Sequence, residues 1–340
     1  MSQSQPRAKE PTPDPANTKS KSTRFLGKIA AFFISTVVCL SIFFGADFYL
    51  HYRHGVNLWG YRGPAAGLKQ PDEKRIAILG GSTSWGYGLR SGQDFPAQLQ
   101  RLLASGNAAR AARIHVLNFG FNNEGAYSFA YTLNDYDYLK YDAVLFYSGY
   151  NDLGGPNLNV FRHRSPVFLW TGYLPLLPTL AADRLSQWQR TRSGKNDKII
   201  FQPPDPDRPN QPPRPQTQFE NLDGASSPAP QPAATACPAE WQFYCDHIYE
   251  ATELALKKGK RVLIVGEPYI TEKHAAQQTA LENMVRARFA NRPQVNYLNL
   301  GRVVDLRDPS LCWDGMHLTE EGNRRIAEAL AKPVLELLKD

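Results

Sequence analysis

From residue 75 onward, short apolar runs alternate along the chain with stretches in which apolar residues recur at helical spacing. The runs have the length and composition of buried strands, and they cover residues 75–79, 114–119, 143–147, 261–265 and 295–300. The helical spacing covers residues 95–103, 127–139, 272–289 and 318–338. Strands that alternate with helices predict a parallel sheet enclosed between layers of helices.

The region from 153 to 260 interrupts this alternation. Residues 167–180 (VFLWTGYLPLLPTL) are strongly apolar, and four interpretations stay open: a lid, a wall facing the substrate, a surface that touches a membrane, or ordinary core packing. Ten of the 26 prolines fall between positions 203 and 232. This composition is typical of an extended, flexible segment, so we expect residues 203–236 to form an insertion without a core.

A stretch of 18 residues without a charged side chain, residues 29–46, precedes these elements. Its length suffices for a helix to cross the bilayer core. Basic residues precede it, so the positive-inside rule puts residues 1–28 in the cytoplasm as a disordered tail. We therefore expect a single-pass protein of the inner (cytoplasmic) membrane, with a transmembrane helix at 29–50, a connection at 51–74 and a periplasmic or otherwise extracytoplasmic domain at 75–340.

Two alternatives compete with the membrane anchor. A cleaved signal peptide requires small residues at the third and the first position before the cleavage site, and Phe44-Gly45-Ala46 supplies only the second of these. A buried core helix requires neighbours that cover it, and the polar residues 1–28 are unsuited to that task.

The net charge of +7 is unevenly distributed. Six basic and two acidic side chains give residues 1–28 a charge of +4, which leaves +3 for the rest of the chain. A nucleic-acid-binding domain carries a basic stripe on its folded part, so the charge distribution indicates no nucleic-acid partner. The apolar fraction of 42% is enough for a sizeable core.

Of the four cysteines, Cys39 lies in the apolar stretch, and the other three are expected to face an oxidising compartment. One disulfide among Cys237, Cys245 and Cys312 is predicted, and three unpaired thiols are the alternative. If Cys237 and Cys245 shared a helix, they would lie about 12 Å apart, too far to bond, and Cys312 would be the partner. The spacing contains no paired CxxC and predicts no metal site.

Ser82 follows the first apolar run and two glycines, and Asp314 and His317 lie near the carboxyl end. A serine, a histidine and a carboxylate are the groups that a serine hydrolase or acyltransferase uses as nucleophile, base and orienting partner. The alternatives are a structural turn at Gly80-Gly81-Ser82 and a helix cap at Asp314, for which Thr319 is a rival.

Two loops follow the second and the third predicted strands. Asn118-Phe119-Gly120 offers a backbone N–H at Gly120, and Gly149-Tyr150-Asn151-Asp152 offers the side-chain amide of Asn151. In a parallel sheet the carboxyl ends of the strands share one edge, so we expect both loops beside Ser82, although ordinary turn chemistry explains each alone. His274 is expected either to line the site or, by preference, to lie on a helix surface.

Four blocks of the sequence resemble those of the SGNH (GDSL-like) hydrolase superfamily, membrane-anchored bacterial type. They are Gly80-Gly81-Ser82-Thr83, Gly120, Gly149-x-Asn151-Asp152 and Asp314-x-x-His317, and the first places Gly81 where the family usually has Asp. The resemblance implies a flavodoxin-like three-layer α/β/α sandwich with a parallel sheet. It also implies Ser82 as nucleophile, His317 as base, Asp314 as its partner, and an oxyanion hole formed by Ser82, Gly120 and Asn151.

Two other motifs are excluded on inspection. The serine block lacks the last glycine of G-x-S-x-G and the lysine of a P-loop. We expect an anchored esterase that acts through an acyl-enzyme on Ser82, on O-acylated glycans or lipids, without metal or cofactor. An O-acyltransferase with the same site, or a non-catalytic glycan-binding or assembly protein, are the alternatives.

Overall fold

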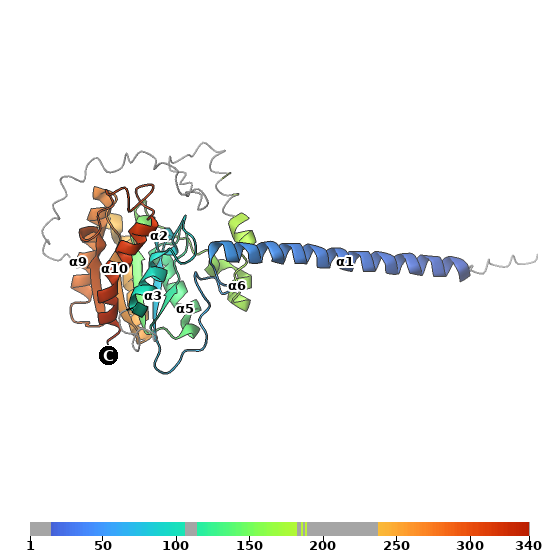
Figure 1. Cartoon of the computed structure of the whole chain (residues 1–340), viewed down its shortest axis with the longest axis horizontal. Coiled ribbons are helices and arrows are strands. Elements are labelled where there is room, and N and C mark those ends of the chain that lie inside the picture. The colour runs from blue at the N-terminus through green and yellow to red at the C-terminus, as the bar shows by residue number, and fades with distance from the viewer. Residues whose placement is uncertain (1–14, 106–113, 182–184, 186–187, 189–236, 340) are drawn as a thin grey trace, which may run out of the picture. The chain divides into compact units, whose positions relative to one another are not determined.

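The computed structural model describes residues 15–105, 114–181, 185, 188 and 237–339 (Figure 1). The chain separates into two compact units, Met1–Tyr49 and Leu50–Asp340. The described part of the first unit is helical, and this helix, α1 (Pro15–His54), ends in the second unit. Its segment Phe25–His54 is long and apolar enough to cross a membrane, and none of its most apolar window of 18 residues is buried. This window therefore does not pack as a core helix.

The second unit contains one sheet of five parallel strands in the order β2-β1-β3-β4-β5. The predicted parallel sheet is confirmed, and its strand order is the flavodoxin-like one. Each strand lies within two residues of its predicted bounds, because a short buried apolar run is a strong local signal. The strands are β1 (Lys74–Gly80), β2 (Ile114–Asn118), β3 (Ala143–Ser148), β4 (Arg261–Gly266) and β5 (Val295–Asn299).

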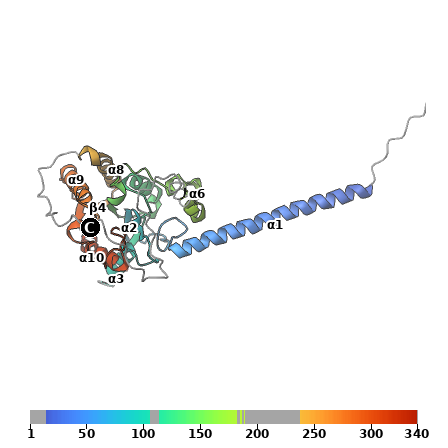
Figure 2. The same cartoon turned by 90° about the horizontal axis from the view of Figure 1, so that it is seen from above.

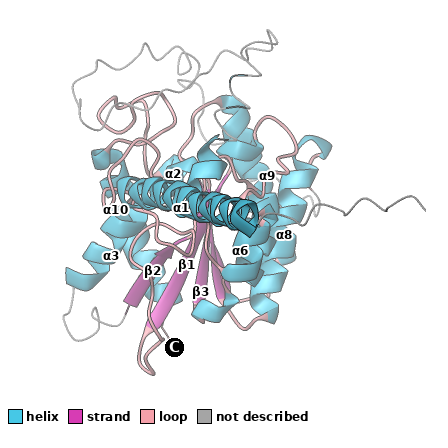
Figure 3. Cartoon of the chain, turned by 90° about the vertical axis from the view of Figure 1, so that its right-hand side faces the viewer, coloured by secondary structure: helices cyan, strands magenta, loops and turns pink. Residues whose placement is uncertain are grey.

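Helices cover both faces of the sheet, which confirms the three-layer sandwich (Figures 2 and 3). One layer contains α3 (Phe95–Ser105) and α10 (Glu320–Leu337), and the other contains α5 (Phe129–Asp135), α8 (Gln242–Lys257) and α9 (Glu272–Arg288). Further short elements are α2 (Ser82–Trp85), α6 (Pro166–Thr171), η1 (Ala126–Ser128), η2 (Asp137–Leu139), η3 (Tyr150–Asp152), η4 (Arg162–Arg164), η6 (Ala239–Trp241) and η7 (Leu300–Arg302).

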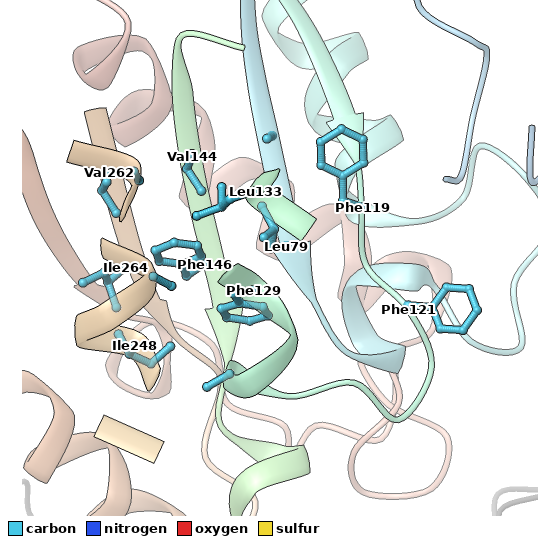
Figure 4. Close-up of a cluster of buried hydrophobic side chains, with 14 of the residues drawn as sticks. Leu79, Phe119, Phe121, Phe129, Leu133, Val144, Phe146, Ile248, Val262 and Ile264 are labelled. Atoms are coloured by element: carbon cyan, nitrogen blue, oxygen red, sulfur yellow. The ribbon is translucent and has the colours of Figure 1, made fainter. Parts of the chain in front are cut away.

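Alternate residues of each strand point to opposite helix layers and form two hydrophobic cores. In β3, Val144 and Phe146 belong to the core beneath α5 and α8, and Leu145 belongs to the core beneath α3 and α10. Figure 4 shows Phe129 and Leu133 of α5 on the first of these cores. Burial on both faces explains why the central strands read as continuous apolar runs, and it makes the sheet a rigid support for the loops at its edge.

Two predicted helices differ from the structure, and one helix was not predicted. The helix predicted at 127–139 is broken into η1, α5 and η2, and α8 was not predicted within the interrupted region 153–260. The last helix begins at Glu320 because the Thr319 side chain accepts a hydrogen bond from the Gly322 N–H at 3.0 Å. Thr319, and not Asp314, is thus the cap of this helix.

The apolar segment 167–180 is divided between the interior and the surface. Phe168, Leu174 and Leu176 are buried, whereas Leu169 is 56% and Trp170 is 91% exposed. Core packing therefore accounts for only part of the segment. The proline-rich insertion predicted at 203–236 lies outside the described residues.

Cys237 and Cys245 form a disulfide, and Cys312 is a buried free thiol. Cys237 lies before η6 and only Cys245 lies on α8, so the chain bends between them and their Cα atoms are 6.4 Å apart. A helix shared by both cysteines, which would have required Cys312 as the partner, is therefore excluded.

Candidate active site

Ser82 is the first residue of α2, immediately past the end of β1. The two positions before it require glycine because neighbouring atoms lie too close for a Cβ, and not because of their own dihedral angles. A Cβ on Gly80 would lie 2.5 Å from the Tyr147 carbonyl oxygen, and one on Gly81 would lie 2.1 Å from Asn151 Nδ2. Only glycine lets this turn pass so close to the neighbouring strand and loop, which brings Ser82 beside Asn151.

The structure brings Ser82, His317 and Asp314 together. Ser82 Oγ lies 2.9 Å from His317 Nε2, and His317 Nδ1 lies 2.7 Å from Asp314 Oδ2. The other carboxylate oxygen, Asp314 Oδ1, accepts hydrogen bonds from the N–H groups of Met316 and His317 at 2.9 and 2.7 Å. Asp314 thus holds both the turn that carries the histidine and the ring itself.

Two aromatic side chains enclose the His317 ring. Trp313 stacks on it with ring centroids 5.2 Å apart and an interplanar angle of 16°, and Tyr87 lies at 4.8 Å on a tilt of 42°. These contacts restrict rotation of the imidazole and keep Nε2 directed at Ser82. Neither residue was predicted from the sequence, and the position of Trp313 next to Asp314 is the only signal that points to one of them.

Gly120 and Asn151 lie close to the Ser82 turn, but both have partners. A Cβ on Gly120 would lie 2.2 Å from Ser84 Oγ, which places the glycine against α2. Its N–H donates to Asn118 Oδ1 at 3.0 Å, so this N–H already has an acceptor. The Asn151 amide donates to the Glu124 carbonyl oxygen at 2.8 Å.

Two buried carboxylates lie behind these loops and were not predicted. Burial raises the pKa of Glu267 to about 7, against the opposing effect of hydrogen bonds from the Thr83 hydroxyl and the Tyr150 N–H. Burial likewise raises the pKa of Asp152 to about 7, and the hydrogen bond from the Ala126 N–H opposes the shift. Clustered groups with strongly shifted pKa values are typical of functional sites.

His274 does not lie on the helix surface, as was preferred from the sequence. It is fully buried on α9, with its ring centroid 4.8 Å from that of Tyr150, and its Nε2 lies 3.0 Å from Gln278 Nε2. Burial lowers the pKa of this histidine to about 3, so the ring is neutral. Among the residues that the structure describes, no group of three or more His, Cys, Asp or Glu is arranged to hold a metal ion.

No protein-family model matches the chain, and a search of curated proteins finds no match. Among solved structures, it is similar to a family 3 carbohydrate esterase from Clostridium thermocellum, with 15% identity, coverage of 78% of this chain and 97% of that one, and a TM-score of 0.43. It is also similar to an acetylxylan esterase from Geobacillus stearothermophilus, with 13% identity, coverage of 80% of this chain and 98% of that one, and a TM-score of 0.42. A GDSL-like lipase from Bacteroides thetaiotaomicron is similar with 12% identity, coverage of 81% of this chain and 94% of that one, and a TM-score of 0.41.

Proposed function

We propose that the protein is a membrane-anchored serine ester hydrolase of the SGNH type, with Ser82 as nucleophile, His317 as general base and Asp314 as the residue that orients the base. The observation that carries the proposal is the continuous chain of hydrogen bonds from the Ser82 hydroxyl through His317 to Asp314. Such a chain at the end of a parallel strand is the arrangement that activates a serine hydroxyl for attack on an ester.

The hydrogen bonds give the direction of proton transfer. Asp314 accepts from His317 Nδ1, so the proton of the neutral ring lies there and Nε2 keeps its lone pair. As Ser82 Oγ attacks the ester carbonyl carbon, its proton passes to Nε2. The imidazolium returns this proton to the alcohol oxygen as the C–O bond breaks, which leaves the acyl group on Ser82. Water then attacks by the same route and releases the carboxylic acid.

Three donors are proposed for the oxyanion that forms in each step: the N–H of Ser82, the N–H of Gly120 and the side-chain amide of Asn151. Donors aimed at this charge usually supply the largest single part of the catalytic effect. The Gly120 N–H and the Asn151 amide now face Asn118 Oδ1 and the Glu124 carbonyl. In the reaction both donors turn from these neutral acceptors to the oxyanion, or bind the two at once, because a charged oxygen is the stronger acceptor.

We propose that α1 anchors the domain in the inner membrane, with the amino-terminal end in the cytoplasm. The exposed apolar window of α1 supports the anchor, and the basic residues before it support the orientation. The disulfide between Cys237 and Cys245 supports an oxidising, extracytoplasmic location for the domain. In such a place the enzyme meets two classes of ester substrate, O-acylated glycans and lipids. The exposed apolar side chains of Leu169 and Trp170 on α6 support the second class, lipid esters.

The test is labelling of the full-length protein in detergent with a fluorophosphonate, which reacts with activated serines. We expect wild type to be labelled and to hydrolyse p-nitrophenyl acetate, and Ser82→Ala to do neither. Ser84→Ala is the matched control, because it removes a hydroxyl two residues away that donates to the Gly81 carbonyl. Labelling that persists in Ser82→Ala, or a folded wild type that is never labelled, would overturn the proposal and favour the binding protein.

A further inference from the structure

A buried carboxylate that the proposed mechanism does not use lies behind the reacting groups. Glu267 directly follows β4 and is 2% exposed. Its Oε1 accepts a hydrogen bond from Thr83 Oγ1 at 2.6 Å, and its Oε2 accepts one from the Tyr150 N–H at 2.7 Å. Thr83 follows Ser82 and Tyr150 precedes Asn151, so each bond ends one residue from a proposed catalytic group.

We propose that Glu267 is a positioning residue that fixes the Ser82 hydroxyl and the Asn151 amide relative to each other through Thr83 and Tyr150. This inference rests on the proposed function. Because β3 lies between β1 and β4, the side chain reaches from the end of β4 past β3 to the turn after β1. One carboxylate thereby ties three strand ends together, and a misplacement of about 1 Å in such a site costs about 10²-fold in rate.

Glu267 is poorly suited to stabilising the fold alone. It is fully buried, and its raised pKa shows that burial opposes the charged form. No cation pairs with it in the described part of the chain. A buried carboxylate without a cation costs stability at neutral pH, whereas both of its oxygens are directed at the loops of the site. The arrangement therefore favours accurate placement of Ser82 and Asn151 over stability of the fold.

The test compares two replacements of similar volume in the full-length protein in detergent. Glu267→Gln keeps an acceptor for the Tyr150 N–H and a polar contact to Thr83, and Glu267→Met keeps neither. We expect E267Q to retain kcat within about fivefold and E267M to lose about 10²-fold, with KM nearly unchanged because the lost contacts do not touch substrate. If E267M lowers the melting temperature but leaves kcat within about fivefold of wild type, Glu267 is structural only.

A second pair of variants keeps the inference testable if E267M does not fold. Thr83→Val removes the hydroxyl at equal volume, and Thr83→Ser keeps it. We expect T83V to lower kcat about tenfold and T83S to restore it. The double variant T83V/E267M should be no slower than E267M, since E267M already removes the contact that T83V removes. Equal rates in T83V and T83S, or losses that simply add in the double variant, would overturn the inference.

Amide hydrogen exchange separates this inference from the proposed function. We expect E267M, but not E267Q, to exchange faster both at residues 82–85 and at residues 150–152, because the shared contact between these turns is lost. Unchanged exchange at both turns would overturn the role of Glu267 even if the enzyme is active. A wild type that is neither labelled nor active would overturn the proposed function alone, since the exchange result does not depend on turnover.

Discussion

Two regions of the domain contain a hydroxyl, a histidine and an aspartate in the same hydrogen-bonded order. In the first, Ser82 Oγ lies 2.9 Å from His317 Nε2, and His317 Nδ1 lies 2.7 Å from Asp314 Oδ2. In the second, Thr132 Oγ1 lies 2.9 Å from His163 Nε2, and His163 Nδ1 lies 2.6 Å from Asp135 Oδ2. The distances agree within 0.1 Å, so distances alone do not distinguish a catalytic set from a structural one.

The surroundings of the two hydroxyls distinguish them. Thr132 lies inside α5, is 1% exposed and hydrogen-bonds the Ser128 carbonyl one turn earlier. In addition, Arg162 Nε donates to His163 Nε2 at 3.2 Å, which occupies the lone pair that a general base needs. Ser82, in contrast, begins α2 at a strand end beside two glycines and the Asn151 amide. Ser82 is itself only 9% exposed, so a catalytic set is marked by a nucleophile at a strand end and by a base whose lone pair faces it, as well as by the correct distances.

The largest expected effect separates the two histidines. His317→Ala should lower kcat for p-nitrophenyl acetate by about 10⁴-fold or more, because the base is lost. His163→Ala should leave kcat within about threefold but lower the free energy of unfolding by about 1–3 kcal/mol, because buried polar partners lose their hydrogen bonds. Kinetics and urea denaturation measure the two effects. Near-normal turnover in His317→Ala would remove that histidine from the mechanism.

The two aspartates give the next largest contrast. In Asp314→Asn the remaining Oδ1 still accepts from the N–H groups of Met316 and His317, so the turn is preserved. The amide in place of Oδ2 favours the wrong tautomer of His317, and we expect kcat to fall by about 10³–10⁴-fold. Asp135→Asn should change kcat little. Equal kinetic effects of the two substitutions would show that the sets do not differ in the way proposed here.

The sequence was sufficient to predict the strands, the layer order and the residues of the Ser82 set, because these depend on local patterns and short motifs. Glu267 was missed, since an acid after a strand is common in loops and its meaning depends on Thr83, 184 positions away. The satisfied Gly120 N–H was missed because it depends on the rotamer of Asn118. The bend that lets Cys237 reach Cys245 was missed because it depends on where α8 begins, and α8 was not predicted from the sequence.

Among the proposed oxyanion donors, only Asn151 contributes through a side chain. Asn151→Ala should lower kcat by about 10²–10³-fold, as loss of one such donor typically does. Asn157→Ala is the matched control, because its exposed amide also donates to a loop carbonyl, that of Asn123. Thr132→Val should resemble this control. If Asn151→Ala and Asn157→Ala behave alike, the Asn151 amide does not bind the oxyanion.

The smallest expected effect concerns the acids buried around the Ser82 set. The pKa of Asp152 is raised to about 7 in the folded protein, chiefly by burial, from an ordinary value of 3.8. Between these two pH values the folded chain keeps a proton that the unfolded chain has lost, so this group makes stability fall as pH rises from about 4 to about 7, with no further change above.

The variant Asp152→Asn cannot titrate at this position. Its melting temperature relative to wild type should therefore rise across that window, by roughly 2–4 °C for each 1 kcal/mol that the charged form costs. Asp246→Asn, an exposed acid on α8, is the control for loss of a charge. A difference between Asp152→Asn and wild type that is constant from pH 4 to pH 8 would show that burial does not perturb this carboxylate.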